Sequence, residues 1–228
     1  MSRHTNVKPS RAAGVNWDES PYVTYSTARG FDLAAQASGG ASVNALYDSR
    51  DNAINPDRGV FASASYRAFA KGFLGGDSDW QELYIDVRSY VKTTKDARHK
   101  LAFWIYADLV TSGVAPYFDL PATGMNTAGH SGRGSNEGRF RGEQLAYGEI
   151  EYRATLLRNG LVGLVAFLNT TTVSSRHTGE KLFDDFLPGA GFGVRLLIDK
   201  QSRTNLCLDF GWGRQGSHGV YLSVQEAF

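Results

Sequence analysis

Apolar and polar residues alternate along most of the chain, whereas the three-to-four-residue spacing of an amphipathic helix is almost absent. The clearest example runs from Leu101 to Leu109, where apolar side chains occupy every second position. Because successive side chains of a strand point to opposite faces, this period predicts strands with one apolar face. Eight strands are predicted in this way, at residues 42–48, 59–70, 83–92, 101–109, 149–156, 192–198, 205–212 and 220–228. A ninth strand candidate, at residues 161–168, is apolar on both faces, so the period does not orient it.

The connectors between these runs are alternately short and long. The short ones lie at residues 92–99, 158–160 and 199–204, and the longer or glycine-rich ones at 71–79, 113–142, 174–186 and 213–219. An antiparallel meander with turns at one end and loops at the other produces this order. The connectors therefore favour an all-β fold, with an up-and-down arrangement that closes into a barrel.

Nine strands do not fit a barrel whose two ends lie on the same side, because such a barrel needs an even number. A tenth strand is one solution, at Tyr22–Tyr25 or at Phe31–Gln36. A second solution is that the first run lies outside the barrel, which leaves eight strands. A third is that further strands lie upstream of this sequence. The expected count in this chain is therefore 8–10 strands.

The chain divides into an N-terminal lead at residues 1–40, with room for one strand, and a barrel at residues 41–228. Residues 1–12 are basic and polar, and no apolar stretch of 7–15 residues follows them. We therefore expect that a signal peptide is not present in this chain.

Composition excludes several classes of protein. With 228 residues, 42% apolar residues and 12% aromatic residues, the chain can build one packed domain and is not intrinsically disordered. A net charge of +1 argues against nucleic acid as a partner, because such binding depends on neutralising phosphates. The single cysteine, Cys207, excludes a disulfide framework and a cysteine-based zinc site. No run of 18 apolar residues predicts a transmembrane helix, but transmembrane β-strands need only about ten alternating residues.

Alternation alone does not say which face of the sheet is wet. The apolar face points inwards in a soluble barrel and towards lipid in an outer-membrane barrel. The polar face carries acids and bases in alternation, such as Glu149, Glu151 and Arg153. Interspersed charges suit a narrow hydrated lumen, and they suit a solvent-exposed surface equally well.

Four segments decide between these alternatives. Residues 46–59 read as a strand, an Asp/Asn/Pro/Gly turn and a strand, and residues 133–142 form an Arg/Gly-rich part of the longest loop. Residues 187–195 read Leu-Pro-Gly-Ala-Gly-Phe-Gly-Val-Arg, and residues 209–213 read Asp-Phe-Gly-Trp-Gly before the final run. In this order and spacing they resemble the C-terminal barrel of the BamA-like outer-membrane superfamily, of the bacterial surface-antigen type. The resemblance covers residues 41–228.

The resemblance implies an antiparallel up-and-down transmembrane β-barrel in a bacterial outer membrane. The implied function is to assist insertion or translocation of a polypeptide, or to anchor a partner domain. The implied partners are outer-membrane lipid, the barrel assembly machinery, client polypeptides and a second copy in a homodimer. No enzyme activity and no cofactor is implied. A small passive pore is the alternative function, and an outer-membrane esterase or lipase is the third.

The longest loop carries the residues that the family resemblance singles out. In the family, an Arg-Gly-aromatic motif folds back into the lumen, where its arginine meets a carboxylate on a later strand. Arg133-Gly134 matches this motif, with Ser135 in place of the aromatic residue, and Asn169 stands where the family has the carboxylate. The continuation of the loop motif is Gly138, Arg139, Phe140 and Arg141, and the candidate partners of Arg133 in the lumen are Asn169, Glu149, Glu151 and Asp209.

The resemblance also implies a role for the C-terminal residue and an orientation for the apolar rows. Phe228 closes the last apolar run, and in the family a terminal phenylalanine is the sorting residue that the assembly machinery reads. If the barrel spans a membrane, the apolar rows face lipid; these rows are built on Leu83, Phe103, Ile150, Phe192, Leu206 and Leu222.

Enzyme and metal signals are weak. Gly129–Gly132 falls short of a Gly-x-Ser-x-Gly nucleophile elbow and lies in a loop. Ser131 with His130 or His177 is the one pairing that could support an esterase. The five histidines lack the spacing of metal ligands, so we expect no catalytic site and no metal site.

Overall fold

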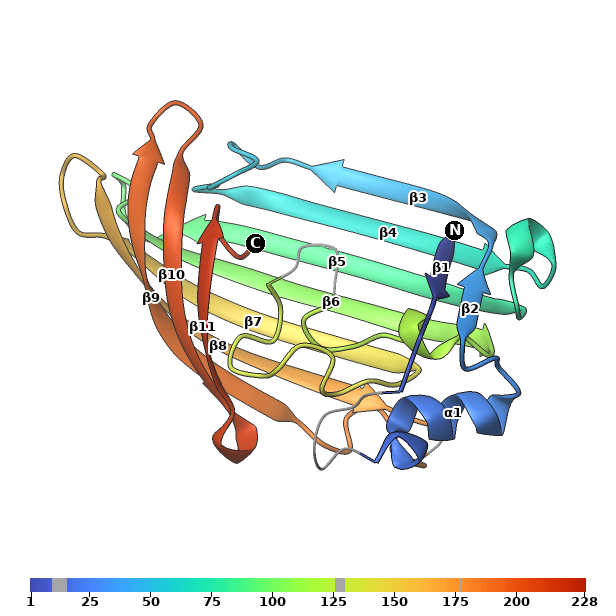
Figure 1. The fold of residues 1–228 in the computed structure, drawn as a ribbon. Helices are drawn as coiled ribbons and strands as arrows, with labels where there is room; N and C mark the ends of the chain where they lie inside the picture. The colour runs from blue at the N-terminus through green and yellow to red at the C-terminus, as the bar shows by residue number, and fades with distance from the viewer. Residues whose placement is uncertain (10–15, 126–129, 177) are drawn as a thin grey trace.

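The computed structural model describes residues 1–9, 16–125, 130–176 and 178–228. In these residues nine strands form one antiparallel sheet in chain order, and each predicted run corresponds to one of them (Figure 1). The strands are β3 (Gly40–Asp48), β4 (Gly59–Phe69), β5 (Trp80–Lys92), β6 (His99–Gly113), β7 (Gln144–Thr155), β8 (Val162–Ser174), β9 (Leu187–Asp199), β10 (Thr204–Gly213) and β11 (His218–Val224). The predicted all-β meander is confirmed.

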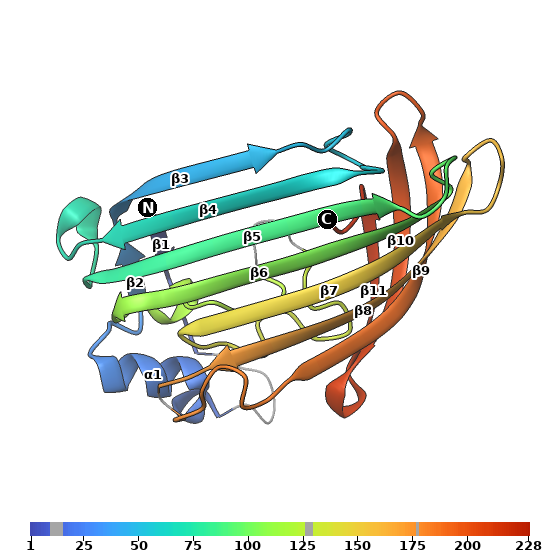
Figure 2. The same cartoon turned by 180° about the vertical axis from the view of Figure 1, so that it is seen from behind.

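The connectors lie at two ends of the sheet, as their lengths predict. We call the end with connectors 49–58, 93–98, 156–161 and 200–203 the turn side. The opposite end, with connectors 70–79, 114–143, 175–186 and 214–217, is the loop side. The views from front and back show the sheet curving strongly, with β9 to β11 turned against β3 to β6 (Figures 1 and 2).

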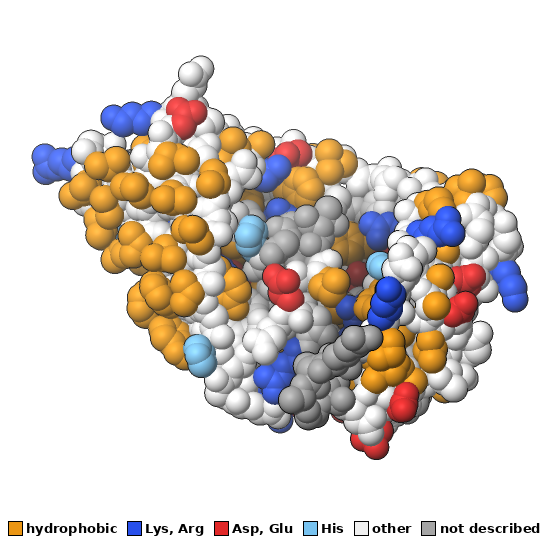
Figure 3. Space-filling view, in the orientation of Figure 1, with side chains coloured by type: hydrophobic (Ala, Val, Ile, Leu, Met, Phe, Trp, Pro, Cys, Tyr) orange, Lys and Arg blue, Asp and Glu red, His pale blue; other side chains and the backbone are white. Residues whose placement is uncertain are grey.

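The apolar rows lie on the outer face of this curved sheet. Ile150 is 38% exposed, Phe192 52% and Leu222 72%, whereas Trp104 and Glu151 on the inner face have no exposed surface. Hydrophobic side chains gather over the outer face of β9 and β10 (Figure 3). An apolar outer face with a polar inner face is the arrangement of a membrane barrel, since a soluble barrel has the reverse.

The sheet is not closed. Among the described residues, no strand pairs with the outer edge of β3 or with that of β11. The two edges approach each other through turns on the turn side, where Asn52 Nδ2 lies 3.4 Å from the Ser202 carbonyl oxygen and Arg203 Nη1 lies 3.0 Å from Asp57 Oδ2. The opening between β3 and β11 is thus bridged on the turn side.

The N-terminal lead contains a helix where the sequence suggested a strand. Residues 21–29 form α1 (Pro21–Arg29), so the strand prediction for Tyr22–Tyr25 is wrong. The local reason is helix capping: the Ser20 side chain accepts a hydrogen bond from the Val23 amide, Pro21 opens the helix, and Gly30 ends it at φ 74°. These boundary signals override the β-propensity of the tyrosines.

The alternative tenth strand also lies outside the main sheet. The segment 31–36 overlaps β2 (Ala35–Ser38), which pairs with β1 (Ser2–Thr5) in a separate two-stranded sheet. Short 3₁₀ turns complete the structure: η1 (Trp17–Glu19), η2 (Phe73–Gly75), η3 (Tyr117–Asp119) and η4 (Arg214–Gly216). No helix in the described residues is long and apolar enough to cross a membrane.

The lead packs against the inner face at the loop side. Tyr25 of α1 forms a buried apolar cluster with Trp80, Val110 and Leu120, and its hydroxyl donates to the Ala115 carbonyl oxygen at 2.9 Å. The hydroxyls of Ser2 and Ser38 both donate to the Asp119 carboxylate. β1, α1 and β2 therefore lie at the loop-side end of the interior.

Candidate functional site

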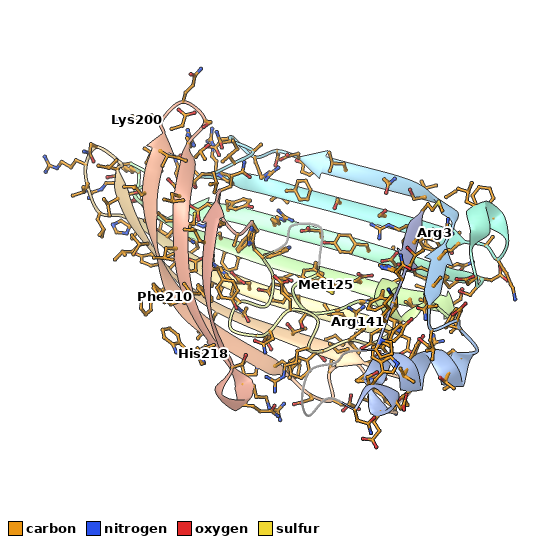
Figure 4. The ribbon with its side chains drawn as sticks, viewed as in Figure 1. Arg3, Met125, Arg141, Lys200, Phe210 and His218 are labelled. Carbon is orange, nitrogen blue, oxygen red and sulfur yellow. The ribbon has the colours of Figure 1, made fainter. Side chains whose placement is uncertain are left out.

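The 114–143 connector between β6 and β7 folds back over the inner face of the sheet. Figure 1 shows this loop crossing in front of β6 to β8, and Figure 4 shows Met125 and Arg141 of the loop there. Arg133, deep in the loop, is 1% exposed. The part of the loop around Arg133 thus lies inside the curve of the sheet.

Arg133 meets three acids from two strands. Its Nη1 donates to Asp209 Oδ2 on β10 at 2.6 Å, and its Nη2 donates to Glu149 and Glu151 on β7. The guanidinium carbon lies 3.8 Å from the centre of the Phe167 ring on β8. Ion pairs and an aromatic face together hold the buried cation, as a desolvated charge requires.

The backbone of the loop is held at the same place. Asn169 Nδ2 on β8 donates to the Arg133 carbonyl oxygen at 3.0 Å, and the Gly134 amide donates to Tyr221 Oη on β11 at 2.8 Å. A carbonyl oxygen needs a hydrogen-bond donor. The side-chain amide of asparagine can donate, whereas an ionised carboxylate can only accept. Asn169 therefore anchors the loop backbone, while the carboxylates come from β7 and β10.

Glycines on β10 make room for the loop. A methyl group at Gly211 would lie 2.8 Å from the Gly134 nitrogen, and one at Gly134 would lie 2.6 Å from the Trp212 carbonyl oxygen. Gly134 also has φ 102°, which side chains disfavour. The glycines of the 209–213 segment are thus explained by a close backbone approach, which sequence reasoning did not anticipate.

The acids around Arg133 are shared with two more arginines. Arg195 donates from Nη1 to Asp209, and Arg153 Nε donates to Glu151 Oε2 at 2.7 Å. Glu226, after β11, accepts from Arg195 Nε at 2.7 Å. The result is a buried network in which every charged group has a partner of opposite sign, so no charge is buried alone.

The C-terminal residues turn into the interior. β11 ends at Val224, Gln225 has φ 90°, and Phe228 is 5% exposed. The Phe228 ring lies 5.2 Å from the Trp104 ring, and its carbonyl oxygen accepts from Arg153 Nη2 at 3.0 Å. The predicted final run to residue 228 is therefore too long, and Phe228 does not belong to the lipid-facing row. Its sorting role stays a prediction.

The rest of the loop motif stays away from the acids. Arg139 Nη2 donates to Gln215 Oε1 at 2.6 Å, and the Arg139 guanidinium lies 5.4 Å from the Phe140 ring centre. Arg141 Nη1 donates to the carbonyl oxygens of Tyr117 and Leu120, earlier in the same loop. Gly138 has φ 68°. Arg133 alone of these residues reaches the β7 and β10 carboxylates, whereas Arg141 fixes the loop's own shape.

The weak esterase candidate gains no catalytic geometry from the described residues. Ser131 Oγ shares a hydrogen bond with Tyr106 Oη at 3.0 Å. Burial, with Arg133 nearby, lowers the pKa of His130. His177 lies outside the described residues. Among the residues that are described, no group of three or more His, Cys, Asp or Glu side chains could hold a metal ion.

Comparison with known proteins agrees with this architecture. Among solved structures, the chain is similar to BamA from Haemophilus ducreyi lacking POTRA domains 1–3, with a TM-score of 0.69 and 13% identity. The similarity covers 91% of this chain and 46% of that chain, so this chain spans about half the length of the match. No curated protein sequence matches. The family model of the Omp85 superfamily domain matches residues 18–221. The chain therefore belongs to the Omp85 superfamily, which confirms the resemblance drawn from its motifs.

Proposed function

We propose that this chain is a membrane-embedded part of a bacterial outer-membrane protein that assists insertion or translocation of other polypeptides. The observation that carries the proposal is the clamp of Arg133 on Glu149, Glu151 and Asp209. It fixes the loop against β7, β8, β10 and β11, next to the edge of β11 that has no partner strand among the described residues. Membership of the Omp85 superfamily supports the same role.

An unpaired strand edge in a membrane suits a polypeptide client. Its free N–H and C=O groups are a template for another strand, and hydrocarbon offers them no competing water. The loop and the tail hold β9, β10 and β11 from the inside. Gly134 of the loop bonds Tyr221 on β11, and Glu226 of the tail accepts from Arg195 on β9 and from Asn205 on β10. A client strand that pairs with β11 then meets a prearranged edge, which lowers the entropic cost of pairing. If the chain instead anchors a partner domain, the same loop and tail contacts keep the strands rigid as the support.

The test is client assembly by the full chain in phospholipid vesicles. The readout is the protease-resistant fraction of a separately unfolded outer-membrane barrel protein, followed over time. Arg133→Ala should slow assembly strongly, because the loop loses its clamp. Arg139→Ala, which removes an exposed loop arginine, should leave the rate unchanged. Equal rates for folded Arg133→Ala and the unchanged chain would contradict the proposal.

A passive pore is the second candidate, and the inner face of β3 favours it. Ser42 and Asn44 on that face are small, polar and exposed. The loop, the lead and the tail occupy much of the remaining interior, which argues against steady conduction. Planar-bilayer recording separates the two functions. A steady channel conductance that increases when residues 130–142 are deleted would favour a gated pore.

A further inference from the structure

The outer face of β7 and β8 carries a notch that the proposed function leaves unused. Figure 2 shows these strands from their outer side. The notch has a volume of about 420 Å³, within the range of about 300–1,000 Å³ that small-molecule sites have. The outer-face side chains that line it are Leu101, Ile150, Tyr152, Ala166, Leu168 and Ala190. Apart from one hydroxyl they are apolar, so the notch suits an apolar ligand that arrives from the lipid side.

Two alanines between larger neighbours form the floor of the notch. Ala166 on β8 pairs with Tyr152 on β7, and Ala190 on β9 pairs with Leu168 on β8. The neighbours stand higher, since Tyr152 is 44% exposed and Leu168 is 61% exposed. An empty hollow would cost its lining atoms their contacts, and an apolar hollow does not hold water. A flexible hydrocarbon chain can take the shape of such a hollow and restore those contacts.

A polar pair of side chains lies at the turn-side end of the notch. The Tyr152 hydroxyl is 2.7 Å from His99 Nδ1, and the two rings stack with their centres 5.9 Å apart. His99 is the first residue of β6, and it precedes Leu101, the partner of Tyr152, by about 7 Å along the strand. Tyrosine is enriched at headgroup level, where one end of its ring is apolar and the other is wet. The pair therefore marks the boundary between acyl chains and headgroups.

The two connectors at this end carry an excess of positive charge. Residues 93–98 and 156–161 hold three basic side chains and one acidic side chain: Lys95, Arg98, Arg158 and Asp96. Arg98 Nη2 donates to the Leu156 carbonyl oxygen at 3.0 Å, so the two connectors lie side by side. Basic residues at the edge of a membrane attract anionic headgroups. The charge next to the notch is thus complementary to a lipid of negative net charge.

We propose that the notch binds an acyl chain of an anionic phospholipid, whose phosphate lies beside His99 and the basic residues of the two connectors. The short turns of bacterial outer-membrane barrels face the periplasm. The lipid therefore comes from the periplasmic leaflet, which consists of phospholipids. This binding differs from the general lipid contact of the outer face, because one position selects one class of lipid. The inference rests on the membrane assignment within the proposed function.

The experiment is photo-crosslinking of the full chain in phosphatidylcholine vesicles that contain a trace of labelled lipid. The label is a diazirine on the acyl chain close to the headgroup, carried by phosphatidylglycerol in one sample and by phosphatidylethanolamine in the other. Labelled peptides are identified by mass spectrometry. We expect phosphatidylglycerol to label residues 150–152, 166–168 and 190 about fivefold more than phosphatidylethanolamine does, the ratio that one basic residue at a charged bilayer surface produces. At Leu222, on the outer face of β11, the two lipids should label equally.

Side-chain changes test the acyl-chain part of the site. Ala166→Leu fills the floor of the notch and should abolish the excess labelling there. Ala107→Leu is the matched control, because it adds the same side chain to the outer face of β6, two residues beyond the exposed Ile105 and outside the notch. It should leave the labelling of the notch unchanged. Equal labelling in the two variants would contradict binding in the notch.

Charge changes test the headgroup part of the site. Replacing Lys95 and Arg158 together by glutamine should bring the ratio between the two lipids in the notch close to one. Lys200→Gln is the control, because Lys200 lies at the tip of the next turn, between β9 and β10 (Figure 4). It should keep the preference for phosphatidylglycerol.

Three results would overturn the proposal. The first is even labelling along the outer face, and the second is equal labelling of the notch by the two lipids in the unchanged chain. The third is a notch without label beside a labelled Leu222, as a second copy seated on the notch would cause. Any of these together with normal client assembly would leave the proposed function standing. A chain with no labelled outer-face residue would overturn the membrane assignment, and with it both the inference and the proposed function.

Discussion

Two regions of one sheet differ in what covers their inner face. On β7 and β10 the inner side chains are large, charged and buried, as with Glu151 and Asp209, and the loop and the tail lie on them. On β3 the inner side chains Ser42 and Asn44 are small, polar and exposed. The shape of β7 to β11 is fixed from the inside. In the described residues β3 pairs with β4 alone, so fewer contacts fix its shape.

The largest expected effect comes from removing the cation of the clamp. Arg133→Ala leaves three carboxylates buried without their shared partner, and breaking a buried ion pair costs about 3–5 kcal/mol. We expect a loss of this order in the free energy of unfolding, measured by urea titration in lipid vesicles. Arg139→Ala should change it by less than about 0.5 kcal/mol. Equal losses for the two variants would contradict the view that the Arg133 contacts stabilise the β7 and β10 region.

The next effect is expected at the tail. Phe228→Ala empties a site between Trp104 and Tyr90, and deleting a buried phenylalanine side chain costs about 3 kcal/mol or more. Leu222→Ala is the matched control on β11, because its side chain is 72% exposed on the outer face. The same titration should rank Phe228→Ala well above Leu222→Ala. The reverse order would show that the tail does not stabilise the inner face.

A smaller effect is expected where the loop crosses β10. Gly134→Ala combines a strained φ with a close approach to Trp212, and strain of this kind costs about 1–3 kcal/mol. Gly72→Ala has a similar positive φ but open space around it, so it isolates the backbone strain. The difference between the two variants in thermal unfolding measures the contact with β10. Equal unfolding temperatures would mean that the loop backbone can shift away from β10 to accommodate the added methyl group.

The smallest effect is expected on β3. Asn44→Ala removes an exposed side chain whose partner is Ser65 on β4, and surface substitutions change stability by less than about 0.5 kcal/mol. The expected result is an unfolding midpoint like that of the unchanged chain when the chain is studied alone. A loss above about 1 kcal/mol, well outside the usual range for a surface position, would show that the inner face of β3 is packed after all.

Strand positions could be predicted because their signal is local. Eight of the nine runs carry their own alternation, the run at 161–168 is apolar throughout, and the order of short and long connectors follows from antiparallel pairing. The helix at Pro21–Arg29 was missed because Tyr22–Tyr25 favours strands, although Ser20, Pro21 and Gly30 marked its ends. Cap residues were the better guide there than side-chain propensity.

The tail and the clamp show where local signals end. Glu226 has the same parity as Val224, so a strand continued to residue 228 would place a carboxylate in the lipid-facing row. That charge was the available sign that β11 stops early. The meeting of Arg133 with acids on both β7 and β10 depends on the curvature of the whole sheet, which no local pattern encodes.

The loop's contacts also constrain the order in which the molecule can form. Arg133 bonds Asp209, 76 residues later in the chain, and Gly134 bonds Tyr221, 87 residues later. Contacts this distant in sequence form slowly, because a long segment must be ordered before they bring any stabilisation. The loop therefore cannot reach its final position until β10 and β11 have joined the sheet. Insertion of the loop is therefore a late step of folding, which can be completed only after β10 and β11 have joined the sheet.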